Sequence, residues 1–207
     1  MTNVTISGNT VSGDGGGIYV LNANPTITNS IIAHNTGSYG IYRESGNPSI
    51  TYSDFYNNQN GNFYNIGNYV GVNVATNANG DSIDAYNNIQ LDPYFVNVAN
   101  DDYHLSDYSP AIGAGTTTGA PTTDIEGNQR PNPEGSNPDM GAYENALPSQ
   151  RPKTGTIADG LSTDIDWSNS SSELSANWAP FTDNDAVTYE YAIGTSTSAL
   201  ADVVDWT

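Results

Sequence analysis

The chain has 207 residues, enough for one medium-sized domain and part of another. It carries 23 acidic and four basic residues, and its formal net charge of −19 disfavours nucleic acid and anionic membranes as partners. No cysteine is present and no apolar stretch is long enough to span a bilayer, so a disulfide framework and membrane insertion are both excluded for this sequence.

A short cassette repeats in the first third of the chain. Asn24–Thr28 (NPTIT) returns as Asn47–Thr51 (NPSIT), and Gly17–Tyr19 returns as Gly40–Tyr42, both after 23 residues. A period of this length is typical of stacked-repeat proteins. The apolar runs within it hold only two or three residues, which is too short for helices and suits small strands. The repeat therefore predicts an all-β solenoid, with one period forming one coil of a parallel β-helix.

Two sets of residues recur at equivalent places in the coils. Inward-facing stacks are predicted from the apolar set, which comprises Ile6, Ile27, Ile32, Ile50 and Phe55. The polar set comprises Asn9, Asn35 and Asn58. Stacked asparagine side chains can hydrogen-bond from coil to coil, so we expect a structural corner ladder rather than a ligand site.

The period becomes irregular between residues 60 and 90. Asp84–Asn88 echoes Asp54–Asn58 after 30 residues, which predicts that the two segments occupy equivalent places. The additional length is expected in a loop around Asn73–Gly80. Such a loop is either a binding insertion or ordinary variation in loop length.

Five motifs follow in a fixed order between residues 91 and 144: Leu91–Phe95, Asp102–Leu105, Ser109–Gly115, Asp124–Pro131 and Pro138–Glu144. This order resembles the closing region of bacterial right-handed parallel β-helix proteins of the pectate-lyase-like superfamily, in particular the group called choice-of-anchor proteins. The resemblance covers about residues 4–145. It implies a right-handed β-helix and a secreted or surface-attached protein, but no particular reaction.

Charged residues in the closing region are expected to be structural. We predict that Asp124, Arg130, Asp139 and Glu144 form buried or semi-buried pairs that clamp the last coil. His34 and His104 are expected to be turn or packing residues rather than acid–base groups. These motifs therefore predict stability rather than chemistry.

The sequence predicts a β-helix with its closing region at residues 1–147, a linker at 148–156 and a partial module at 157–207. Predicted strands at 163–167, 173–178, 187–194 and 203–206 resemble the first half of a fibronectin type III module, a β-sandwich of seven strands. Because Val4 already lies in a repeat unit, we expect that the natural protein begins upstream of this chain.

No catalytic residue is assigned from the sequence. The coil region offers one basic side chain, Arg43, beside Glu44, and both the Arg-x-Pro-x-x-Arg element of pectate lyases and the carboxylate motifs of polygalacturonases are missing. The alternative is a polysaccharide lyase or glycoside hydrolase with its active-site coils upstream of Met1. The enzyme question thus stays open, with a non-catalytic role favoured.

Two binding sites are predicted. Tyr19, Tyr42 and Tyr64 lie at or near equivalent points of successive coils, and with Arg43 and Glu44 they form a candidate carbohydrate-binding track. Their rings could instead face inward, or stack on one another as cross-strand pairs.

The second predicted site is a calcium site, and calcium is the one cofactor considered. Asp92, Asp101 and Asp102 supply oxygen atoms that this ion prefers, although metal-free acidic loops are common. Taken together, the sequence predicts a non-catalytic fragment of an extracellular or cell-surface bacterial protein. Its expected work is adhesion, binding of a polysaccharide or cell-surface glycan, or rigid spacing.

Overall fold

A computed structural model describes residues 1–150, 157–159 and 176–178. The chain divides into two compact units, Met1–Arg151 and Pro152–Thr207. The regular elements of the described residues are short strands joined by turns and loops, together with one 3₁₀ turn, η1 (Val98–Asn100). No helix in this described part is long and apolar enough to cross a membrane.

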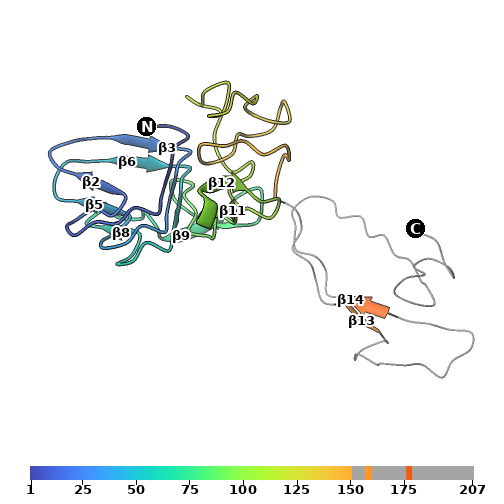
Figure 1. Ribbon diagram of the computed structural model, residues 1–207, viewed down its shortest axis with the longest axis horizontal. Helices are drawn as coiled ribbons and strands as arrows, with labels where there is room; N and C mark the ends of the chain where they lie inside the picture. The colour runs from blue at the N-terminus through green and yellow to red at the C-terminus, as the bar shows by residue number, and fades with distance from the viewer. Residues whose placement is uncertain (151–156, 160–175, 179–207) are drawn as a thin grey trace, which may run out of the picture. The chain divides into compact units, whose positions relative to one another are not determined.

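Three small parallel sheets make up the first half of unit one, and their strands lie one above another in Figure 1. The first sheet holds β1 (Thr5–Ser7), β4 (Ile31–Ala33) and β7 (Asp54–Tyr56), the second holds β2 (Ile18–Val20), β5 (Ile41–Arg43) and β8 (Phe63–Tyr64), and the third holds β3 (Thr26–Thr28) and β6 (Ser49–Thr51). Each step between neighbouring strands in a sheet is one coil of the predicted solenoid.

Strand register follows the repeated cassette residue for residue. Ile27 pairs with Ile50, and Tyr19 pairs with Tyr42, each at the 23-residue shift read from the sequence. The predicted inward stack is also confirmed: Ile27, Ile32, Ile50 and Phe55 are buried in one core, and Ile6 packs against it. Identical residues therefore stack because the coils repeat.

The predicted corner ladder is present. Asn9 Nδ2 donates to Asn35 Oδ1 at 3.0 Å, and Asn35 Nδ2 donates to Asn58 Oδ1 at 2.9 Å. Asn62 continues the row, since it accepts from Asn58 Nδ2 at 2.9 Å and donates to Gln90. Asn35 and Asn58 are buried, so their side-chain amides cannot bond to water and need hydrogen-bond partners within the protein.

The sheet β1–β4–β7 is covered on both faces. Ile32 of β4 points into the solenoid core, whereas its neighbours Ile31 and Ala33 pack in a second core with Ile112 and Met140 of the closing region. Gly141 N donates to the Asn29 carbonyl, and Ala142 N donates to Thr5 Oγ1. The closing region thus packs along the early coils, whereas a clamp on the last coil was expected, and that predicted location is wrong.

The irregular stretch contains an antiparallel hairpin of β9 (Asn73–Thr76) and β10 (Ser82–Asp84). The predicted equivalence of Asp84–Asn88 with Asp54–Asn58 is wrong, because Ile89 rather than Asp84 pairs with Asp54. Because of the inserted residues, the true partner of Asp54 lies five positions after Asp84. A second hairpin, β11 (Phe95–Asn97) and β12 (Asp102–Leu105), leads into the closing region.

In the second unit the structure describes one antiparallel pair, β13 (Ile157–Asp159) and β14 (Ala176–Trp178). β14 falls within the strand predicted at 173–178. The other three predicted strands of the fibronectin-like module lie outside the described residues.

Candidate functional site

The three tyrosines predicted to bind carbohydrate stand in one row on the sheet β2–β5–β8. The ring centroids of Tyr42 and Tyr64 are 4.3 Å apart with an interplanar angle of 12°, and those of Tyr19 and Tyr42 are 5.8 Å apart at 26°. Tyr19 and Tyr64 remain 43% and 41% exposed, so the row faces outward. Strand alternation explains this direction, because the flanking Ile18 and Ile41 point toward the core.

The rings stack on each other, which determines what they offer a ligand. Facing ring surfaces are occupied by the neighbouring tyrosine, so ring edges and hydroxyl groups form most of the outward surface. Tyr39 leans against the row, with its centroid 5.1 Å from that of Tyr64. Partial burial raises the pKa of Tyr42, and a hydrogen bond with Tyr64 and the nearby Asp14 carboxylate act in the same direction. Tyr42 therefore keeps its phenol proton at the centre of the row.

Arg43 and Glu44 lie beside this row but do not pair with each other. Arg43 occupies the register position of Val20, and its guanidinium donates to the Gly46 carbonyl at 3.2 Å and to Asn65 Oδ1 at 3.3 Å. Its Nε is buried without a hydrogen-bond partner. The Glu44 side chain is exposed, and its backbone N–H bonds to Val20. The Arg43 guanidinium is thus fixed by the following turn and by Asn65 of the next coil.

The predicted calcium residues lie around the hairpin β11–β12 without forming a ligand cluster. Asp92 Oδ1 accepts from the Tyr94 N–H at 2.9 Å, while Asp101 follows η1 with a left-handed backbone. The described part of the chain holds no group of three or more His, Cys, Asp or Glu side chains placed to bind a metal ion. The calcium site stays a prediction without geometric support from these residues.

One charged cluster was not predicted from the sequence. His104 Nδ1 lies 2.6 Å from Asp102 Oδ1, its Nε2 lies 3.1 Å from Glu126 Oε2, and its ring packs on Tyr143. The hydrogen bond to Asp102 raises the pKa of His104, and Glu126 adds to the shift. The Asp102–His104 spacing was visible in the sequence, but nothing there indicated Glu126. The cluster therefore connects β12 to the loop that contains Glu126.

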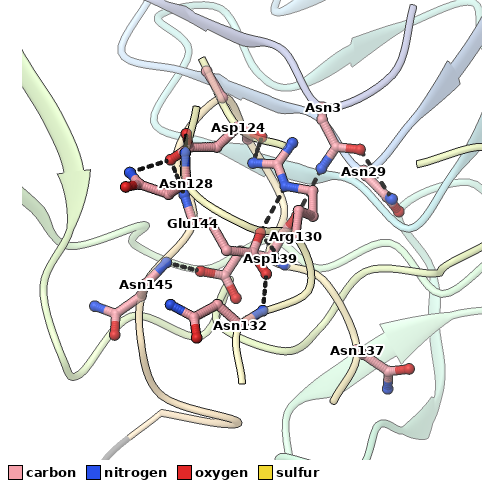
Figure 2. Close-up of polar contacts among 12 residues, drawn as sticks. Asn3, Asn29, Asp124, Asn128, Arg130, Asn132, Asn137, Asp139, Glu144 and Asn145 are labelled. Carbon is pink, nitrogen blue, oxygen red and sulfur yellow. Dashed lines mark hydrogen bonds and ion pairs between the residues drawn. The ribbon is translucent and has the colours of Figure 1, made fainter. Parts of the chain in front are cut away.

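The closing region holds a buried polar network, drawn in Figure 2. Arg130 Nε donates to Glu144 Oε2 at 2.7 Å, and both side chains are almost fully buried, which confirms the predicted pairing. Asp139 accepts from the Gly113 and Asn145 N–H groups, and burial raises its pKa well above the usual value. With these bonds inside the fold, the network stabilises the closing region.

Asp124 belongs to the same network. Burial alone would raise its pKa, but hydrogen bonds from Asn128 and from the Glu144 and Glu126 N–H groups outweigh it and lower the pKa. All of the carboxylate oxygens just described face protein donors. This set of residues does not resemble an open catalytic centre.

A family model described as a right-handed beta helix region matches residues 2–129. The chain belongs to the right-handed β-helix family. No curated protein and no solved structure matches it. Within this β-helix, the tyrosine row is the surface feature that the repeat itself builds, whereas the buried closing network serves the fold.

Proposed function

We propose that this β-helix is a non-catalytic module of a secreted or cell-surface bacterial protein that contacts a neutral polysaccharide through the tyrosine row. The supporting observation is the in-register line of Tyr19, Tyr42 and Tyr64 on an outward sheet face, with the first and last rings more than two-fifths exposed. Adhesion by the whole protein would use the same surface, and rigid spacing would need only the stacked coils.

The geometry favours a particular kind of contact. Because the rings cover one another, a sugar would meet a line of phenol hydroxyls and ring edges rather than a series of open ring faces. Hydroxyl groups both donate and accept hydrogen bonds, which suits the hydroxyls of a neutral glycan. An acidic glycan is disfavoured, since the chain carries a net charge of −19.

Two finer assignments belong to this proposal. The motifs between Leu91 and Glu144 support membership in the pectate-lyase-like superfamily and its choice-of-anchor group. The strands predicted from the sequence between residues 163 and 206 support a partial fibronectin type III module. Both would place the chain outside the cell, where a glycan ligand is available.

Affinity electrophoresis of the full chain in gels that contain neutral or acidic polysaccharides tests the proposal. We expect retardation by at least one neutral polymer, and we expect Tyr19→Ala with Tyr64→Ala to abolish it. Tyr108→Ala is the matched control, because Tyr108 is 45% exposed but lies outside the row. Its retardation should equal that of the wild type.

The same polymers are incubated with the protein and assayed for reducing ends and for unsaturated uronates. Product formation would favour the lyase or hydrolase alternative and contradict a non-catalytic role. Retardation that survives the double tyrosine variant would remove the row from the binding site.

A further inference from the structure

The third sheet of the solenoid is shorter than the other two. Within the described residues it consists of β3 and β6, whereas the sheets β1–β4–β7 and β2–β5–β8 have three strands each. After β8 the chain leaves the coil path through residues 66–72 and forms the β9–β10 hairpin instead. The lower edge of β6 is therefore without the strand that a regular third coil would supply.

A groove of about 460 Å³ lies along this edge. Pro48, Ser49 and Ile50 form one wall, and Ile66–Val70 with Tyr86 form the other. All of these lining residues are uncharged, and Tyr69 is 61% exposed at the rim. A groove of this size, lined by both apolar and uncharged polar groups, could hold a short segment of peptide.

Backbone groups of β6 point into the groove. Neighbouring residues of a strand direct their N–H and C=O groups to opposite sides. The Ser49 N–H donates to the carbonyl of Pro25, the residue before β3, so the Ile50 N–H and the Pro48 carbonyl point away from β3. The Ile50 carbonyl already accepts from Asn88 Nδ2 at 3.1 Å. One N–H and one C=O thus remain to pair with one residue of an added parallel strand.

The side chains around this edge specify which strand would fit. The Asn47 N–H bonds to Asn24 Oδ1 at 2.7 Å, Thr28 and Thr51 hydroxyls lie 3.2 Å apart, and Ile50 stacks in register with Ile27. A further Asn-Pro-Thr-Ile segment would continue the asparagine and isoleucine rows, whereas the place beside Thr51 is taken by Tyr86, whose carbonyl accepts from the Tyr52 N–H at 3.1 Å. Its isoleucine would lie below Ile50, next to Ile66 and Val70, which already pack against the solenoid core.

We propose that the β6 groove binds an extended peptide segment of the Asn-Pro-Thr/Ser-Ile type by β-strand addition. The bound segment would be the third strand of the β3–β6 sheet. Its threonine N–H would donate to the Pro48 carbonyl, as the Ser49 N–H does to Pro25, and its carbonyl would accept from the Ile50 N–H. A neutral or basic partner is favoured because the chain is strongly acidic. This site is separate from the tyrosine row.

The probe is a fluorescein-labelled peptide, acetyl-Asn-Pro-Thr-Ile-Thr-Asn-amide, titrated with the full chain and followed by anisotropy. We expect saturable binding that weakens at least tenfold when aspartate replaces the isoleucine of the peptide. Gly67→Trp should fill the groove and weaken binding at least tenfold. Gly13→Trp is the control: an added Cβ at Gly13 or Gly67 meets no atom within 4 Å, but only Gly67 lines the groove.

Thermal unfolding of both tryptophan variants shows whether they keep the wild-type fold. Absence of peptide binding at millimolar concentration would overturn the proposal, and so would equal binding by the Gly67→Trp and Gly13→Trp proteins. Neutral oligosaccharides are added as competitors. If they displace the peptide, the groove is a sugar site and strand addition is wrong.

Discussion

At the scale of single residues, the asparagine corner shows how a repeat produces stability. Asn35 is fully buried, and its amide bonds to Asn58 and to the Ile6 carbonyl while it accepts from Asn9. We expect Asn35→Ala to lower the free energy of unfolding by about 2–3 kcal/mol, because buried partners lose their hydrogen bonds. Urea unfolding measures this loss. The exposed Asn9→Ala should cost less than about 1 kcal/mol, and similar costs at both positions would contradict a buried ladder.

Asp54 is a residue whose effect depends on pH. It lies fully buried between Ile31 and Ile89 in the first sheet, and its Oδ2 has no hydrogen-bond partner. Burial raises its pKa well above the usual value, although a bond from the Leu91 N–H opposes the shift. The protonated form is therefore the one that the fold accepts. Its contribution to stability is complete below the pKa of the unfolded chain and declines as pH rises toward the raised pKa of the folded chain.

Asp54→Asn tests this effect, because asparagine keeps the shape and cannot ionise. We expect the free energy of unfolding of Asp54→Asn, relative to that of the wild type, to increase as pH rises from about 4. Urea midpoints at a series of pH values give the difference between the two proteins. A difference that does not change with pH would show that Asp54 is ionised in the fold as readily as in the unfolded chain.

At the scale of elements, the Arg130–Glu144 pair connects two loops of the closing region. Removal of one partner leaves a buried charge, so Arg130→Met should lower the free energy of unfolding by about 3–5 kcal/mol. Glu144 would then lose the cation that opposes the effect of burial on its pKa. The double variant Arg130→Met, Glu144→Gln should lose less than the sum of the single losses. Additive losses in urea unfolding would show that the two side chains act independently.

Elements were predictable from the sequence where the repeat is exact. Ile27 and Ile50 had to stack because they occupy the same place in two equal coils, and the same holds for the buried Asn35 and Asn58. Asp84 was misplaced because the β9–β10 insertion breaks the period, and local similarity then selects the wrong register. Glu126 beside His104 could not be foreseen, since non-repeating loops carry no periodic signal.

At the scale of the whole first unit, stability depends on the closing region packing against the first sheet. Gly141 lies at this contact, with a φ of +96°, and an added Cβ there would lie 2.8 Å from Ile31 Cδ1 and 2.9 Å from Thr5 Oγ1. Gly119 has a similar positive φ of +77°, but an added Cβ meets no atom within 4 Å. An alanine at either position would have to adopt a left-handed backbone, which costs free energy. Only at position 141 would its Cβ also overlap with Ile31 and Thr5.

Comparison of the two alanine variants therefore isolates the packing contact. We expect Gly119→Ala to cost about 1 kcal/mol from backbone strain alone. Gly141→Ala should cost a further 1–3 kcal/mol or so, because Ile31 is held in the core by Ile112 and Met140 and cannot move freely. Urea unfolding measures both losses, and hydrogen exchange in β1 and β4 should increase in Gly141→Ala alone. Equal losses of unfolding free energy in the two variants would mean that the closing region can shift at this contact without cost. The stability of the unit would then depend on the coils and not on this packing.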